Sequence, residues 1–257
     1  MNQSGFNSSN LGARNFLSDD NSQNDLTNVS LIWICSTPEL QLKCIKNILG
    51  ITKSKILIEK PISLDPLINS EVLDLIKGND NIFISRPWNY SKIWRSFLAD
   101  SKSQGEIKHL EVRHFGEVVR NFITPPQDWL HHDICLLEEI ISLHKYKNTD
   151  YQIDWSANRD TLRITGNGDV TLEVNGGFSN TRESSISVTF NDKSKMVLNL
   201  NEKSYSKVNA MNEIETLKFE TNDSIPTMID YLIKLNSNSE DRLKERNILN
   251  SLQLLSI

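Results

Sequence analysis

Lys55-Ile-Leu-Ile-Glu59-Lys60-Pro61 is the stretch that decides the fold, because it joins a buried strand directly to a charged pair. The apolar, β-branched run in front of Glu59 predicts a parallel strand that is covered on both faces. Proline has no N–H to donate to a sheet, so the strand must end and the backbone must turn at this point. Ligands of open α/β sheets bind just beyond the carboxyl ends of strands. The charged pair is therefore either part of a site or an ordinary solvated strand end.

Two similar stretches flank this one and end in the same way. The apolar run 31–35 stops at Ser36-Thr37-Pro38, and the run 81–85 stops at Arg86-Pro87. Residues 38–50 and 66–78 lie between the three runs, and both have apolar residues at helical spacing with a closing glycine. Alternating strands and helices predict parallel strands joined by right-handed crossovers. All three strand ends should therefore lie on one edge of the sheet.

The pattern changes after Pro87. A helix around Trp94 leads to a strand over 107–115, and a Pro-Pro turn at 125–126 precedes a helix that starts at Asp128. From Leu162 the chain reads as short alternating strands, followed by helical patterns over 225–235 and 240–254. A parallel α/β part followed by a β-rich α+β part predicts two domains, residues 1–87 and 88–257.

Composition excludes several classes of partner. The 257 residues are 38% hydrophobic and 24% charged, which is typical of a globular protein with a sizeable core. The formal net charge is -5 and no run is rich in Lys and Arg, so neither nucleic acid nor a membrane surface is indicated as a partner. Cys35, Cys44 and Cys135 have no metal-ligand spacing and are expected to be small buried residues in a reducing compartment. The absence of a signal peptide and of a bilayer-length apolar run favours the cytoplasm. The polar segment 1–27 is expected to be loop or short helix.

Asp128 and His132 are the pair in the second part that could carry chemistry. They are four residues apart on a predicted helix, so they share a face beside the apolar stripe. A carboxylate next to an imidazole can fix its tautomer and stabilise its protonated form, as a general base requires. The ordinary alternative is a helix-end Asp with a surface His. His131 and Asp133 are close rivals, and a metal site is disfavoured because adjacent residues on a helix diverge.

Taken together, these motifs resemble the glucose–fructose oxidoreductase/inositol dehydrogenase (Gfo/Idh/MocA) family. The resemblance rests on Ser36-Thr37-Pro38, on Glu59-Lys60-Pro61, on Arg86 and on Asp128-x-x-x-His132, and it runs from about residue 29 to the C-terminus. It implies an incomplete Rossmann-type parallel sheet followed by an α+β domain with a large, open, mainly antiparallel sheet. It also implies a homo-oligomer, a dimer or tetramer, built through that second sheet.

The family's chemistry is hydride transfer between a hydroxyl carbon of a sugar or polyol and NAD or NADP. By resemblance, Lys60 lies near the nicotinamide and the substrate hydroxyl, His132 takes the hydroxyl proton, and Asp128 orients His132 or binds a neighbouring hydroxyl. The residues expected to border the cofactor are Ser36, Thr37, Pro38, Glu59, Lys60 and Arg86. A hydroxyl that loses hydride must also lose a proton, which an amine and an imidazole together can accept.

The sequence also departs from the family in ways that bear on activity. No G-x-G-x-x-G turn follows a strand, although such a turn lets the backbone approach a pyrophosphate. Gly166-Asn-Gly168 is better explained as a hairpin turn. Leu42 stands where the family usually has His, residues 124–127 replace a glycine cluster, and the third acidic position of the helix motif is Cys135. The chain is therefore expected to lack the first βαβ unit of the cofactor domain. A non-catalytic homologue, or a longer protein whose missing unit is encoded upstream, stays open beside the oxidoreductase.

Overall fold

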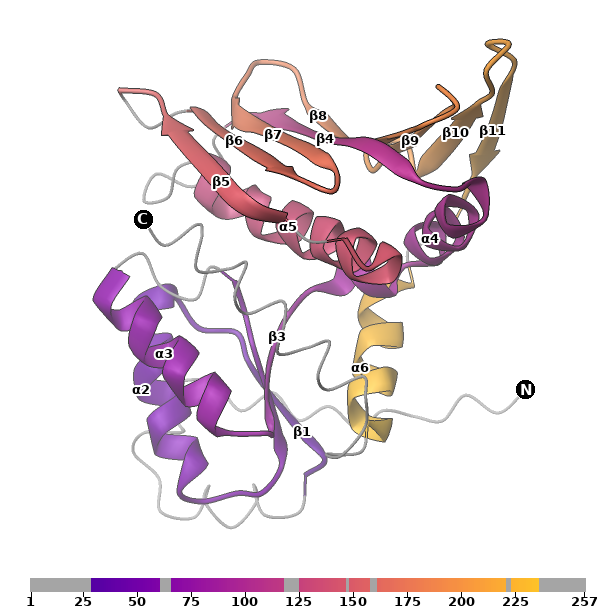
Figure 1. Ribbon diagram of the computed structural model, residues 1–257. Helices are drawn as coiled ribbons and strands as arrows, with labels where there is room; N and C mark the ends of the chain where they lie inside the picture. Colours follow the sequence, from indigo (N-terminus) through magenta and orange to yellow (C-terminus); the bar gives the residue numbers. More distant parts are fainter. Residues whose placement is uncertain are drawn as a thin grey trace, which may run out of the picture.

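The first part of the chain is a parallel sheet with helices on both faces (Figure 1). The structure, a computed structural model, describes residues 29–60, 66–117, 125–146, 148–157, 161–220 and 223–235. Strands β1 (Leu31–Ile34), β2 (Lys55–Ile58) and β3 (Ile82–Ile84) pair in parallel in the order β1-β2-β3. Helix α2 (Pro38–Leu49) joins the first two strands, and α3 (Pro66–Gly78) lies between the next two in the chain. The predicted strand–helix alternation is confirmed.

Side chains alternate cleanly between the two faces of this sheet. Ile56 and Ile58 point to the face where α2 and α3 pack, together with Ile34, Ile82 and Ile84. Leu57 and Phe83 point to the other face, against Met228 and Leu232 of helix α6 (Ser224–Lys234). Each strand is therefore apolar on both sides, which is why its sequence is a continuous apolar run and not an alternating one.

Helix α6 returns to the first sheet from the far end of the chain, beside β1 and β3 in Figure 1. The ammonium of Lys55, at the start of β2, donates to the carbonyl oxygens of Leu232 (2.6 Å), Ile233 (2.8 Å) and Leu235 (2.6 Å). These are carbonyls of the last helical turn, which have no partner inside the helix. A lysine there satisfies them and opposes the negative end of the helix dipole. The division at residue 87 stays a prediction, and α6 is the segment that crosses it.

Replacing Lys55 with Met should lower the free energy of unfolding by about 2 kcal/mol, because three charge-assisted hydrogen bonds to carbonyls, two of them partly buried, are lost while the aliphatic stem is kept. Urea unfolding of the two chains measures this difference. The matched control is Lys46→Met, because Lys46 forms an exposed ion pair with Glu71. Such pairs contribute about 0.5 kcal/mol or less. Equal losses in the two variants would contradict the role given to Lys55.

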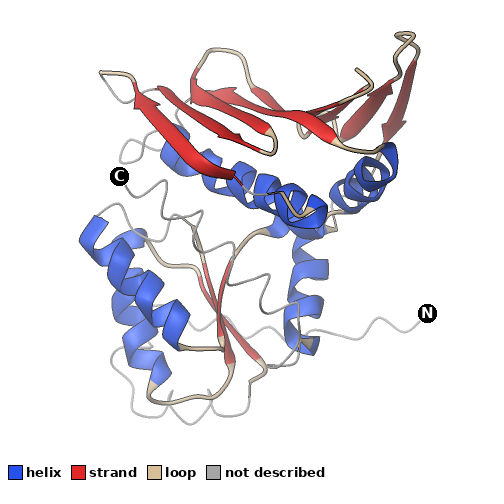
Figure 2. Cartoon of the chain, viewed as in Figure 1, coloured by secondary structure: helices blue, strands red, loops and turns tan. Residues whose placement is uncertain are grey.

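The second part of the chain is an eight-stranded sheet whose described helices pack on one face (Figure 2). Its strand order is β11-β10-β9-β8-β4-β7-β6-β5, and only the central pair β4 and β7 is parallel. The predicted large, mainly antiparallel sheet is confirmed. The strands are β4 (Ile107–Gly116), β5 (Asn148–Trp155), β6 (Thr161–Gly168), β7 (Thr171–Phe178), β8 (Glu183–Phe190), β9 (Lys195–Asn199), β10 (Ser204–Val208) and β11 (Ile214–Lys218).

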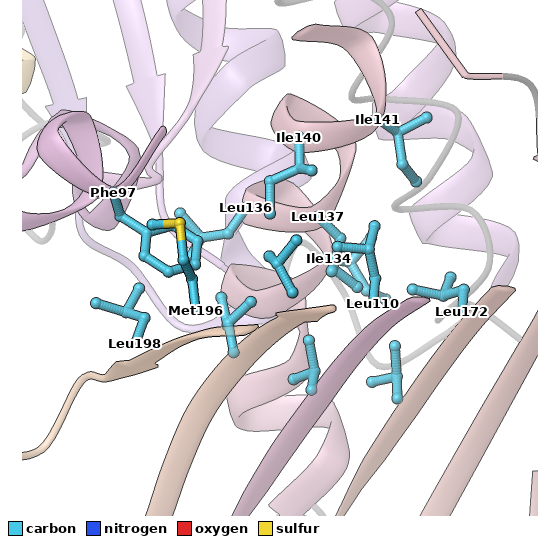
Figure 3. Close-up of a cluster of buried hydrophobic side chains, with 14 of the residues drawn as sticks. Phe97, Leu110, Ile134, Leu136, Leu137, Ile140, Ile141, Leu172, Met196 and Leu198 are labelled. Carbon is cyan, nitrogen blue, oxygen red and sulfur yellow. The ribbon is translucent and has the colours of Figure 1, made fainter. Parts of the chain in front are cut away.

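Two helices cover the inner face of this sheet and form its core. They are α4 (Lys92–Gln104), which follows the short helix η2 (Pro87–Tyr90), and α5 (Pro125–His144). Figure 3 shows side chains of α5, such as Ile134 and Leu137, packed over Leu110 and Leu172 of the sheet. Close contact requires glycine at one point, because a Cβ on Gly176 would lie 2.9 Å from a methyl carbon of Leu130. Helix α5 therefore lies between the two sheets.

Several local predictions are corrected. Helix α5 begins at Pro125, not at Asp128, because proline is well suited to the first turn of a helix. Cys35 is exposed and Cys44 half-buried, and only Cys135 is buried as expected. The segment 166–168 ends β6, and the hairpin turn follows it. Within the described residues no helix is both long and apolar enough to span a membrane. The predictions for residues 1–27, Pro61 and 240–254 lie outside the described part.

Candidate functional site

The carboxyl ends of β1, β2 and β3 lie on one edge of the first sheet, as predicted. Register pairs Ile34 with Ile58 and Ile58 with Ile84, so the residues that follow these strands are neighbours. This edge carries Ser36, Thr37 and Pro38 after β1, Glu59 and Lys60 after β2, and Arg86 after β3. Helix α5 approaches the same edge, because Cys135 belongs to the apolar cluster of this sheet and the charge of Arg86 acts on its thiol. The site therefore lies where the two parts of the protein meet.

Glu59 and Ser36, both on this edge, differ in whether their side chains have a hydrogen-bond partner. The carboxylate of Glu59 accepts a hydrogen bond of 2.9 Å from the indole N–H of Trp33 in β1, so a neighbouring strand fixes it. The hydroxyl oxygen of Ser36 is buried and has no hydrogen-bond partner among the described residues. A buried hydroxyl without a partner is costly and is typical of a position where a bound molecule supplies the missing bond.

Arginine side chains are mostly exposed in proteins, but that of Arg86 is not. Its side chain is buried, its guanidinium carbon is 5.7 Å from the centre of the Tyr90 ring, and it donates to the Tyr90 hydroxyl at 3.5 Å. A guanidinium over an aromatic face is stabilised by the ring's quadrupole. Its expected contact with a cofactor stays a prediction.

One side of helix α5 carries residues that contact the first part of the chain and the segment after it. Positions 132, 135 and 139 recur at helical spacing on this side. Cys135 packs with the first sheet, and the carboxylate of Glu139 accepts hydrogen bonds from Asn89 of η2 (2.9 Å) and from the indole N–H of Trp94 in α4 (2.7 Å). Burial raises the pKa of the Cys135 thiol to about 12, so it packs as a neutral apolar group. His132 is one turn before Cys135, so it points toward the edge with the charged strand ends.

His132 and Lys60 are close enough for the ammonium charge to act on the imidazole. Desolvation by burial is the main cause that holds the pKa of His132 well below its ordinary value, and the charge of Lys60 adds to it. His132 is consequently neutral at neutral pH, the state in which an imidazole can accept a proton. The predicted role of His132 as a proton acceptor beside Lys60 stays a prediction.

His131 and Asp133, the alternatives to His132 on this helix, are more buried than His132. His131 is 7% exposed and Asp133 is 1% exposed, whereas His132 is only half-buried. Asp128 lies in α5, and its side chain is outside the described part, so its predicted role stays a prediction. The described side chains contain no group of three or more His, Cys, Asp or Glu residues arranged to hold a metal ion.

One residue near the site was missed from the sequence. His114, near the end of β4, bonds through Nδ1 to the carboxylate of Asp133 at 2.7 Å and stacks on Trp129. A signal for it was present: Leu110 and Val112 alternate toward the core, so position 114 continues an apolar face with a histidine. A polar residue at an inward position predicts a specific partner.

Stability should fall on mild acidification, and His132 should account for part of that fall. The unfolded chain protonates this residue near its ordinary pKa of 6.5, and the folded chain does so only at lower pH. The unfolded state then binds more protons, so the free energy of unfolding decreases as pH falls below about 6.5. His132→Asn removes this contribution. Burial also lowers the pKa of His144, but the contribution of His144 is the same in both chains. Urea unfolding between about pH 7.5 and 5 measures the slopes, and equal slopes would refute this assignment.

The residues of this edge fit one half of a nicotinamide dinucleotide. Ser36 offers a hydroxyl that lacks a partner, and the charge of Lys60 acts on His132, so the nicotinamide and a substrate hydroxyl could both be bound here. The described strand-to-helix junction at Ser36-Thr37-Pro38 has no glycine to admit a pyrophosphate against the backbone. The fit is therefore to the nicotinamide half, and the phosphates have no comparable cradle in the described part.

No family model matches the sequence, and no curated protein matches it either. Solved structures do match the fold. UDP-N-acetylglucosamine 3-dehydrogenase GnnA from Acidithiobacillus ferrooxidans aligns with a TM-score of 0.69 at 12% identity, over 88% of this chain and 77% of that one. A variant of the 3-ketoreductase KijD10 from Actinomadura kijaniata, in complex with TDP-benzene and NADP, aligns at 0.67 and 12%, over 93% and 79%.

A Gfo/Idh/MocA family oxidoreductase from Vibrio cholerae also aligns, with a TM-score of 0.68 at 11% identity, over 91% of this chain and 79% of that one. At such low identity the likeness concerns the fold. The resemblance inferred from the strand-end motifs is thus matched by the architecture: a Rossmann-type parallel sheet followed by a large antiparallel sheet.

Proposed function

We propose that this chain, which has the fold of the Gfo/Idh/MocA oxidoreductases, is an NAD(P)-dependent oxidoreductase that acts on a hydroxyl of a sugar, a sugar derivative or a polyol. The observation that carries the proposal is a neutral His132, on which the charge of Lys60 acts, together with the three parallel strands that end at the edge carrying Lys60. That edge is where open α/β sheets bind their ligands.

The roles follow from the chemistry of each group. The bound nicotinamide supplies the acceptor or donor of hydride. Lys60 donates a hydrogen bond to the substrate oxygen and stabilises negative charge on it, because its ammonium is a cation in a partly buried place. His132 accepts the hydroxyl proton, since its depressed pKa keeps the ring unprotonated. Asp128, four residues earlier on α5, orients His132 or binds a neighbouring hydroxyl.

Glu59 and Ser36 help to position the nicotinamide at the carboxyl edge of the first sheet. Glu59 is held by Trp33, so the turn that carries Lys60 is tied to the neighbouring strand. The hydroxyl of Ser36, with Thr37 and Pro38, borders the nicotinamide, and Arg86 completes that edge beside β3. These assignments follow the family's motif residue by residue.

A turnover assay tests the proposal. The purified chain is incubated with about 5 mM NAD or NADP, since weak dinucleotide binding is expected, and a panel of UDP-N-acetylglucosamine, D-glucose and myo-inositol. Absorbance of the reduced nicotinamide reports oxidation. Turnover that Lys60→Met abolishes supports the proposal. Absence of turnover with every sugar, in a folded preparation, would contradict it.

A second candidate is a non-catalytic homologue that keeps the sugar-binding and oligomerising half. The observation in its favour is the lack of a glycine-rich turn in the sequence. Sugar binding without dinucleotide binding or turnover would place this candidate first. Both candidates share the expected cytoplasmic location.

For either function we propose a homo-oligomer, a dimer or tetramer, formed through the open face of the eight-stranded sheet. No described helix covers this face. It carries ion pairs across neighbouring strands, Arg113 with Glu183 at 2.7 Å and Arg163 with Glu173 at 3.1 Å. A polar, flat sheet face of this kind can pair with a second copy related by a two-fold axis. Light scattering gives the mass in solution, and a monomer would contradict the proposal.

A further inference from the structure

His114 is placed by strand alternation on the inner face of the large sheet. Leu110 and Val112 precede it on that face and are fully buried. His109, by contrast, lies on the open face and bonds to Thr171. The imidazole of His114 therefore points toward helix α5, near the end of β4.

Helix α5 holds this ring from two sides. The ring stacks on Trp129 with centroids 5.1 Å apart and an interplanar angle of 15°. Its Nδ1 is 2.7 Å from Oδ2 of Asp133, whose side chain is 1% exposed. Trp129 and Asp133 are four residues apart and so lie on one side of the helix. Gly116 lets the indole approach, because a Cβ there would lie 3.1 Å from Cη2 of Trp129.

The carboxylate of Asp133 determines which ring nitrogen of His114 carries the hydrogen and which one can bind a ligand. An ionised carboxylate only accepts, so Nδ1 carries the hydrogen, and in the neutral ring Nε2 is left with a lone pair. Nε2 makes no hydrogen bond to any described residue and is not among the buried polar atoms that lack a partner. The side chain is 12% exposed. In its neutral form the ring thus presents Nε2 as an oriented acceptor on a partly exposed side chain.

The acceptor lies beside the proposed site. Asp133 directly follows His132 on α5, so the 2.7 Å contact with Asp133 brings His114 near His132. His114 of β4 and His132 of α5 thus lie near each other, and the charge of Lys60, which follows β2, acts on His132. Both a buried carboxylate and a stacked indole hold the single, partly exposed ring of His114. This fixes the orientation of the ring, which a simple packing contact between a helix and a strand does not require.

We propose that His114 is a substrate-binding residue: its Nε2 accepts a hydrogen bond from a sugar hydroxyl next to the one that reacts. The inference rests on the proposed function. It assigns a chemical requirement to the substrate, which must present a hydrogen-bond donor to β4. Asp133 is a positioning residue that acts through the tautomer of His114.

The competing explanation is that the pair only ties α5 to β4. His114→Asn separates the two, because the amide N–H of Asn can still donate to Asp133 while the Nε2 acceptor is removed. The matched control is His109→Asn, which changes the same residue type on the same strand, on the opposite face. Calorimetry with the three panel sugars measures binding, and thermal unfolding checks the fold.

We expect His114→Asn to weaken sugar binding by about tenfold at an unchanged melting temperature, with His109→Asn like the wild type. Asp133→Asn is the second variant, for use also if His114→Asn fails to fold. Its amide donates to Nδ1, moves the ring hydrogen to Nε2 and should weaken binding similarly. Nitrogen NMR of the ring reads the tautomer directly. Wild-type binding by a folded variant of either kind would overturn the proposal.

If the wild-type chain binds none of the sugars, the proposed function fails, and carbethoxylation by diethylpyrocarbonate decides about His114. This reagent modifies accessible neutral imidazoles, and peptide mapping locates the product. A modified His114 would support an open, ligand-facing Nε2 for a donor of another class. An unmodified His114 would overturn the inference.

Discussion

Replacing His132 with Asn lowers the turnover number by about a hundredfold or more, with a much smaller change in the apparent affinity for the sugar. Asn has a similar shape and can still form a hydrogen bond, but it cannot accept the hydroxyl proton. Because His132 is half-buried beside Lys60 and is kept neutral by burial, its proton-accepting role is needed as the reaction proceeds and not for binding. Initial rates over a range of sugar concentrations separate the two parameters.

The control for this variant is His109→Asn, whose side chain bonds to Thr171 on the open sheet face. Its turnover should stay within about twofold of the wild type, as is usual for a surface change away from a site. A His132→Asn chain with full turnover would remove His132 from the mechanism. If His131→Asn alone lost turnover while folded, the base would be the neighbouring histidine.

The second large effect concerns the cofactor. The 257-residue chain is expected to bind NAD, NADH, NADP and NADPH with dissociation constants of about 1 mM or weaker. Much of a dinucleotide's affinity comes from backbone N–H groups at a glycine-rich turn, which hold the pyrophosphate. Losing several charge-assisted hydrogen bonds, at about 1.5–3 kcal/mol each, weakens binding by orders of magnitude. The strand ends at Ser36 and Lys60 reach only the nicotinamide half.

Calorimetric titration with the four dinucleotides measures this directly. Nicotinamide mononucleotide is the informative comparison, because it lacks the adenosine and the second phosphate. Similar affinities for the mononucleotide and the dinucleotide are expected, since the adenosine half adds little. Micromolar affinity for any dinucleotide would contradict the prediction and require a phosphate cradle of another form.

The first sheet was the most predictable part of the molecule. Its strands are covered on both faces, so each is an unbroken apolar run, and each run ends where proline or charge follows. The large sheet was predictable as a class, because its strands alternate between a covered and an open face. For the edge with Lys60, strand direction alone was sufficient: parallel strands bring their carboxyl ends together.

The long-range contacts were not predictable in the same way. Lys55 was an ordinary strand-end lysine in the sequence, yet its ammonium binds the end of α6, which is far away in the chain. The bond between His114 and Asp133 likewise depends on how α5 crosses β4. The crossing angle cannot be derived from the local periodicity of the sequence. The choice of His132 over His131 was open by period alone. It gains support from Cys135, which shows that this side of α5 faces the first sheet.

The central claim is that hydride leaves a sugar carbon beside Lys60 and His132. The most direct measurement uses the panel sugars with deuterium on carbon and follows the mass of the reduced dinucleotide. The account predicts that one deuterium is transferred to the nicotinamide ring by the wild-type chain and that Lys60→Met abolishes the transfer. Reduced dinucleotide without deuterium, or no transfer from any panel sugar to NAD or NADP at millimolar concentration, would contradict it.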